Sequence, residues 1–206
     1  MPSDGALQWC KTVLPATETG GSGGQQKRND YCSNDNRQPG LSRLQRQEAL
    51  MTEYNFVIKT DDLSSPQTGA LIALHLQGMA ENTPQEHVYA LSESGLRADN
   101  IRVWSVWAGD RIAAVGALKQ ISAAQGEIKS MRAHPDFRGK GAGKLLLLHI
   151  IVQAKQCGMT RLSLETGCHP DFEPALALYR RCGFQSGAAF GDYQAGEHNQ
   201  FFHLDL

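Results

Sequence analysis

The sequence predicts an α+β fold in which helices flank a central mixed sheet that is mostly antiparallel. Residues 101–108 and 111–121 are apolar runs joined by a Gly-Asp pair, which favours a hairpin, and residues 127–133 follow as a third antiparallel strand. A helix is predicted over residues 141–157 and a further strand over 161–165. A strand–helix–strand crossover makes 161–165 parallel to 127–133, so the sheet is mixed.

One strand and two helices are predicted ahead of the hairpin. Residues 55–59 contain a short apolar run that is typical of a strand. A cap residue and a proline then precede a helix over 67–80, whose apolar residues share one face. A second start signal at 83–86 predicts another helix from about 85 to 93.

The last part of the chain predicts one helix and two closing strands. The helix spans 172–182 and tolerates Pro174 in its first turn. The strands are predicted at 184–186 and 199–206, and the glycine-rich segment 187–198 between them is a predicted loop on the substrate side. The complete order is therefore β-α-α-β-β-β-α-β-α-β-β.

Composition divides the chain into an extension and one domain. Residues 1–52 are polar and linker-like, with too little apolar material to offset the entropy of ordering, so they are predicted to be disordered. Residues 53–206 are the predicted domain. Met51 is a candidate native start, which would make the preceding residues dispensable for the fold, and a genuine disordered arm is the alternative.

Charge and cysteine content exclude several classes of function. The net charge of −1 predicts no nucleic-acid partner and no membrane surface. No apolar run approaches the roughly 20 residues that a membrane span needs. The five cysteines are irregularly spaced, so they predict neither a metal site nor a redox pair, and a reducing cytoplasm is the expected setting.

The chain is organised around a glycine-rich turn between the strand 127–133 and the helix that follows it. A helix start leaves backbone N–H groups without partners and carries partial positive charge, and glycines allow an anion to approach them. The segment therefore predicts a phosphate or pyrophosphate site, with a plain basic turn as the alternative. Its spacing differs from a Walker A loop and from the dinucleotide motif. The predicted binding residues are Arg138, Gly139, Lys140, Gly141, Ala142, Gly143 and Lys144.

Two segments resemble motifs of the GNAT superfamily of N-acetyltransferases. Arg138-x-x-Gly141-x-Gly143 resembles the Gln/Arg-x-x-Gly-x-Gly/Ala motif, which holds the pyrophosphate of acetyl-CoA. The second segment is Leu162-Ser-Leu-Glu165-Thr166, followed by Ala175-Leu-Ala-Leu-Tyr179-Arg-Arg-Cys-Gly183-Phe184. The resemblance covers about residues 54–206 and extends to a bacterial subgroup of small acetyltransferases. It implies a GNAT-like fold and acetyl-CoA as the co-substrate.

The resemblance also implies where acetyl-CoA lies. Its pantetheine arm is expected along the strand 127–133, at Met131, Arg132 and Ala133, with backbone contacts at the first and last of these. Many family members have an Asn seven residues before the tyrosine of the second motif. Here that position is Phe172, so the contact of that Asn is absent or replaced.

Two catalytic residues are implied in the same way. Glu127 is the expected general base, because it precedes Arg138 by eleven residues, the separation found in the histone acetyltransferases of the superfamily. Tyr179 is the expected general acid for the departing thiolate. Two alternatives stay open for the base: Glu127 forms a structural ion pair with Lys129 or Arg132, or Glu165 on the neighbouring strand takes the proton.

The predicted function is acetyl transfer from acetyl-CoA to a primary amine of a small molecule or a peptide. The alternative is a catalytically inactive module of the same fold that binds or senses acyl-CoA. Lys129, Arg132 and His134 favour an acidic acceptor only if their side chains face it, which the sequence does not decide. A homodimer stays open as the state of assembly.

Overall fold

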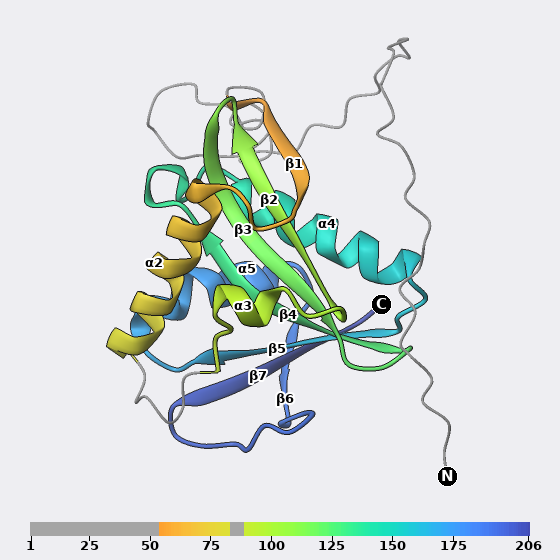
Figure 1. Cartoon of the computed structure of the whole chain (residues 1–206). Helices are drawn as coiled ribbons and strands as arrows, with labels where there is room; N and C mark the ends of the chain where they lie inside the picture. Colours follow the sequence, from red (N-terminus) through yellow and green to blue (C-terminus); the bar gives the residue numbers. More distant parts are fainter. Residues whose placement is uncertain (1–53, 83–88) are drawn as a thin grey trace, which may run out of the picture.

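The computed structural model describes residues 54–82 and 89–206, and in this part of the chain one seven-stranded sheet forms the centre (Figure 1). The strand order is β1-β2-β3-β4-β5-β7-β6, and only the β4–β5 pair is parallel. The strands are β1 (Phe56–Asp61), β2 (Ile101–Ala108), β3 (Arg111–Gln120), β4 (Gln125–Ala133), β5 (Arg161–Gly167), β6 (Gln185–Gly187) and β7 (Asn199–Asp205). The predicted mixed, mostly antiparallel sheet is confirmed.

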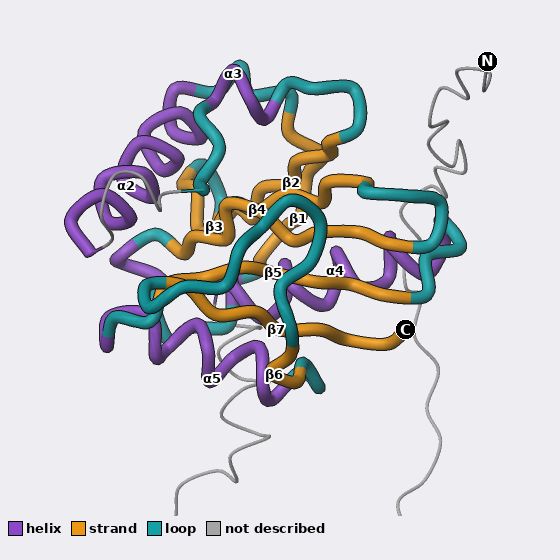
Figure 2. The backbone as a smooth tube through the Cα atoms, turned by 90° about the horizontal axis from the view of Figure 1, so that it is seen from below, coloured by secondary structure: helices purple, strands orange, loops and turns teal. Residues whose placement is uncertain are grey.

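The helices of the described residues are α2 (Pro66–Asn82), α3 (Glu93–Leu96), α4 (Ala142–Gln156) and α5 (Glu173–Arg181). Figure 2 shows α2 and α3 on one side of the sheet and α4 and α5 on the other. None of them has the length and apolarity that crossing a membrane requires. The linker-like extension predicted at 1–52 lies outside the described residues.

The predicted second helix is wrong in its described part. Residues 83–88 lie outside the described residues, and residues 89–92 are not helical. Helix α3 begins only after Ser92, whose Oγ accepts a hydrogen bond from the N–H of Gly95 at 3.2 Å. A serine that satisfies a first-turn N–H favours a helix start at its own position. This local cap decided where α3 begins.

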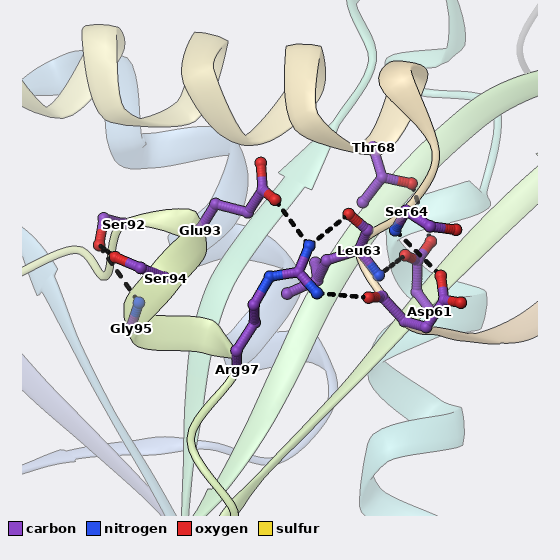
Figure 3. A network of polar contacts seen from close by, with 10 residues as sticks. Asp61, Leu63, Ser64, Thr68, Ser92, Glu93, Ser94, Gly95 and Arg97 are labelled. Atoms are coloured by element: carbon purple, nitrogen blue, oxygen red, sulfur yellow. Dashed lines mark hydrogen bonds and ion pairs between the residues drawn. The ribbon is translucent and has the colours of Figure 1, made fainter.

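A polar network fixes the start of α2 against β1 and α3 (Figure 3). The two carboxylate oxygens of Asp61 accept hydrogen bonds from Leu63 N and Thr68 Oγ1, each at 2.8 Å. Arg97 at the end of α3 donates to the carbonyls of Asp62 at 3.0 Å and Leu63 at 2.7 Å. Asp61 and Arg97 therefore fix the segment between β1 and α2, and with it the predicted helix start near Pro66.

Each face of the sheet buries its own hydrophobic cluster. The cluster between the sheet and helices α4 and α5 includes Ile128, Leu146 and Leu162. The cluster between the sheet and helices α2 and α3 includes Leu71, Leu96 and Val115. Because side chains alternate between the faces of a strand, residues 127 and 129 of β4 lie on the α2 face, opposite Ile128.

β4 and β5 separate after three paired positions. Gln125 to Glu127 pair with Arg161 to Ser163, and neither strand pairs with the other beyond that point in the described sheet. A bulge in β4 accompanies the separation: three steps along β4, from 129 to 132, match two steps along β3, and Ser130 has a φ of 53°. The remainder of β4 therefore presents an open edge towards β5.

Glycines make this arrangement possible on the α4 face. A Cβ at Gly116 of β3 would clash with the Sδ atom of Met131, which lies in the bulge. A Cβ at Gly126, in the paired stretch, would lie 2.7 Å from Leu118 Cδ1 and 2.8 Å from Met159 Sδ. Both positions exclude a side chain because the neighbouring core is already filled.

We expect Gly126→Ala to destabilise the fold, because the new methyl group would overpack the core beside Leu118 and Met159. The expected loss in the free energy of unfolding is about 1–3 kcal/mol, measured by urea denaturation. Gly196→Ala is the control, since the nearest atom to its Cβ would be 3.9 Å away. Equal stability of the two variants would contradict the packing described here.

Candidate active site

The predicted anion-binding residues lie together at the start of α4, with the exception of the side chain of Lys140. Gly139 and Gly141 have φ values of 74° and 96°, which favour glycine, and Gly141 is the N-cap without a side-chain hydrogen bond. The backbone N–H groups of residues 141–144 donate to no acceptor among the described residues. With Arg138 and Lys144 beside them, they form a site that suits an anion. Lys140 lies apart, with Nζ 4.6 Å from the ring centre of Tyr54.

Helix α5 borders the same site. A Cβ at Gly143 in the first turn of α4 would lie 3.8 Å from Leu178 Cδ2, so the two helices are neighbours there. Tyr179 follows Leu178 and is 6 % exposed, with its ring 5.8 Å from that of Phe184. Burial raises the pKa of Tyr179, so the phenol keeps its proton at working pH. Its hydroxyl has no hydrogen-bond partner in the described part of the chain.

The open edge of β4 extends from the anion site at the start of α4 to the positions where β4 pairs with β5. His134 N donates to Ala113 O of β3 at 2.9 Å. Backbone groups alternate along an antiparallel strand, so Arg132 also bonds towards β3, whereas Ala133 directs its N–H and C=O towards the open edge. Met131 lies in the bulge at the same edge. An extended ligand can therefore bond to β4 in place of the missing β5 partner.

Beyond their three paired positions β4 and β5 are separated by a gap, which we call the split. Glu127 lies at the closed end of the split in a buried ionic cluster. Its side chain is 3 % exposed, and Lys129 Nζ lies 3.2 Å from Oε1. Tyr193, from the loop before β7, donates a short hydrogen bond to the same oxygen. Lys129 also donates to Tyr193 Oη at 2.7 Å and to the carbonyl of Tyr89 at 3.0 Å. Of the two ion pairs considered for Glu127 from the sequence, the one with Lys129 is present.

Glu165 lies on the other side of the split and has no such partners. Ser163 of β5 pairs with Glu127, so its side chain lies on the α2 face. Glu165 is two residues further along β5 and therefore lies on the same face. No hydrogen bond or ion pair joins its carboxyl to another described residue. Burial raises the pKa of Glu165 to about 7; Lys129 opposes this shift and Glu127 adds to it. Glu165 can therefore take up a proton near neutral pH.

The loop between β6 and β7 covers this end of the split, and Figure 2 shows it arching across β7 and β5. Ser163 Oγ lies 2.8 Å from His203 Nδ1, and His203 Nε2 lies 2.9 Å from the carbonyl of Ala188. Since a carbonyl only accepts, Nε2 carries the proton and Nδ1 accepts from Ser163. The rings of Phe190 and Tyr193 lie 5.1 Å apart on the same loop.

The sequence predicted a loop on the substrate side here but not the contact of Tyr193 with Glu127. The two residues are 66 positions apart, so no local pattern connects them. Phe172, which stands at the position of the family's Asn, packs its ring against Gly167. A side chain at Gly167 would clash with this ring. The described residues contain no cluster of His, Cys, Asp and Glu that would bind a metal ion.

Comparison with known proteins identifies relatives over most of the chain. The sequence model of the Acetyltransferase (GNAT) family matches residues 68–184. The uncharacterised N-acetyltransferase YedL of Escherichia coli is 41 % identical over 151 residues, which cover 73 % of this chain and 95 % of YedL. The uncharacterised N-acetyltransferase YsnE of Bacillus subtilis is 46 % identical over 136 residues, which cover 66 % of this chain and 90 % of YsnE.

Solved structures show the same fold. The crystal structure of a Bacillus subtilis acetyltransferase in complex with CoA superposes with a TM-score of 0.53 and 22 % identity. The match covers 73 % of this chain and 99 % of that one.

We expect Glu165→Gln to stabilise the fold at about pH 8 and to have little effect at about pH 5. The pKa of Glu165 is raised from 4.5 to about 7 in the folded state, so its carboxyl favours folding below pH 4.5 and loses that contribution as the pH rises through 7. Glutamine stays neutral throughout. The melting temperatures of both proteins at the two pH values test this.

Glu173→Gln is the control for that measurement. Glu173 is 61 % exposed and pairs with Arg180 at the surface, so its removal should change stability little at either pH. A pH-independent effect of Glu165→Gln would show that its carboxyl is not destabilised by ionisation.

Proposed function

The chain belongs to the GNAT family of acetyltransferases, and on that premise we propose that it transfers the acetyl group of acetyl-CoA to a primary amine of a small molecule or a peptide. We assign the activity to residues 53–206. The observation that carries the proposal is the open edge of β4. One end of this edge meets the start of α4, and the other lies across the split from Glu165.

In this proposal acetyl-CoA lies along the open edge. Its pyrophosphate binds the free N–H groups at 141–144 together with Arg138 and Lys144, and its pantetheine amides bond to the backbone of Met131 and Ala133. Acetyl-CoA supplies an activated thioester whose carbonyl the amine attacks. The side chain of Arg132 lies on the α2 face of the sheet.

Glu165 is the better placed general base of the two carboxylates. An amine attacks only after it has lost its proton, and a base is most effective when its pKa lies near the working pH. Glu165 meets that condition and is unpaired. Glu127 is held by Lys129 and Tyr193, and taking a proton would disrupt both contacts. Glu127 then serves as a fixed negative charge that orders the acceptor side.

Tyr179 is the proposed general acid. Its buried hydroxyl keeps its proton and is not committed to another described residue, so it can donate to the departing thiolate. Leu178, its neighbour, lies next to the first turn of α4, which supports a position of α5 close to the proposed path of the cofactor. The three reduced cysteines of the described residues are compatible with a cytoplasmic enzyme.

Glu165→Gln should lower kcat by about 10²–10⁴ near neutral pH, the range for loss of a general base. Part of the loss should return at high pH, where free amine is abundant. In the unmodified chain, kcat/KM should rise with pH through a limb near 7. CoA release from acetyl-CoA, measured with a panel of amino acids, polyamines and short peptides, tests this.

Glu127→Gln is the matched variant for that experiment, since it removes the neighbouring carboxylate. Its effect on kcat should be clearly smaller than that of Glu165→Gln. The reverse order would return the role of base to Glu127. If acetyl-CoA raises the melting temperature but no amine releases CoA, the chain is an acyl-CoA-binding module and the proposal fails.

Tyr179→Phe should lower kcat by about 10- to 10³-fold with the affinity for acetyl-CoA unchanged. The variant keeps the ring and its packing on Phe184 and removes only the hydroxyl. The loss is moderate because a thiolate with a reference pKa of about 8.5 can also depart without an acid. Calorimetric titration with CoA and circular dichroism are the controls. A wild-type rate would reduce Tyr179 to a packing role.

A further inference from the structure

Arg132 directs its side chain to the α2 face of the sheet, beside the open edge of β4. A Cβ at Gly78 in α2 would lie 3.4 Å from Arg132 Nη1. Glycine is unfavourable inside a helix, and at this position it leaves room for the guanidinium. The guanidinium thus occupies a place between α2 and the split, on the same face as Lys129 and Glu165.

This guanidinium has no paired carboxylate among the described residues, unlike its neighbour Lys129. Lys129 pairs with Glu127 at 3.2 Å, whereas Arg132 forms no ion pair with a carboxylate in the described ranges 54–82 and 89–206. Its Nε atom is buried and has no hydrogen-bond partner in the part of the chain that the structure describes. Burial lowers the pKa of Arg132 and Arg138 adds to that shift, while Glu81 opposes it. A partly buried cation without a partner is costly, and an anionic ligand would remove that cost.

His75 on α2 faces the same region and reports its positive character. Burial lowers the pKa of His75 to about 4, and Arg132 and Lys129 contribute to this shift. Near neutral pH the histidine is therefore neutral, so it adds no second positive charge beside Arg132. Among the described carboxylates, Glu127 is bound by Lys129, whereas Glu81 accepts a hydrogen bond from Gln77 and acts on Arg132 through its charge without forming an ion pair.

We propose that Arg132 binds a carboxylate of the acceptor, so that the acceptor is an amine that also carries a carboxylic acid. The planar guanidinium matches a carboxylate with two parallel hydrogen bonds. A carboxylate held there leaves the amine of the same molecule on the face where Glu165 can take its proton. The inference rests on the proposed function, since it assigns a substrate class to that acetyl transfer.

The test uses matched pairs of acceptors: the standard amino acids, β-alanine and 4-aminobutyrate, each with its carboxamide. We expect the chain to acetylate at least one acid form with a kcat/KM far above that of its amide. Arg132→Leu should lower kcat/KM for that acid by about 10- to 100-fold, mainly through KM, the range for losing a hydrogen bond to a charged group. Its kcat/KM for the amide and its Kd for acetyl-CoA should stay unchanged.

Two further variants make the result specific. Arg132→Lys should retain an intermediate preference for the acid, since lysine keeps the charge but loses the two-pronged geometry. Arg161→Leu removes an exposed arginine at the start of β5 and should change nothing.

Four results would overturn the inference: acids and amides used equally well, an equal loss on both in Arg132→Leu, weaker acetyl-CoA binding in that variant, or no acetylation of any pair member by a chain that acetyl-CoA stabilises. The third result would assign the guanidinium to a phosphate of CoA. Absence of any acetyl-CoA binding would instead overturn the proposed function itself, and the inference with it.

Discussion

β4 and β5 are hydrogen-bonded to each other only from Gln125 to Glu127, and the parts of the site are arranged around the gap beyond. The bulge at Ser130 adds one residue to β4 relative to β3 and so turns the strand at the point where pairing stops. Unpaired backbone groups inside a protein must find partners. The open edge of β4 is therefore both a local structural deficit and the surface on which an extended ligand can bind.

The two ends of this edge have different electrostatic character. At the start of α4, backbone N–H groups and basic side chains create a positive environment without any acidic side chain in the first turn. At the closed end, a carboxylate, an ammonium group and a phenol satisfy one another inside the protein, where such contacts are strong. Glu165 and Arg132 are left outside that cluster. Groups that a fold leaves uncompensated reduce its stability and often take part in function.

The acceptor side is assembled from segments that are distant in the chain. Lys129 contacts both Tyr89, which precedes α3, and Tyr193, which precedes β7, and the two tyrosine rings lie 4.9 Å apart. Ser163 and His203 extend the same face across β5 and β7. The loop before β7 therefore contacts Glu127 directly through Tyr193, and the segment before α3 is connected to it through Lys129.

The sequence by itself determined the features that depend on local backbone constraints. The Gly-Asp hairpin and the glycines before α4 each limit the backbone within a few residues, so their positions could be read directly from the sequence. These features were enough to predict the order of strands and helices and the anion-binding turn. The start of α3 was predicted wrongly, because the helix begins after Ser92, whose side chain caps it.

Only the tertiary structure decided which ionisable groups are paired and which are left alone. Glu127 and Glu165 are both candidate bases in the sequence, but Tyr193 and Lys129 bind the first and form no hydrogen bond or ion pair with the second. The direction of Arg132 depends on Gly78, which is 54 residues earlier, and on strand pairing with β3. Charge states and side-chain directions of this kind are set by burial and by contacts between distant residues, which a linear pattern does not contain.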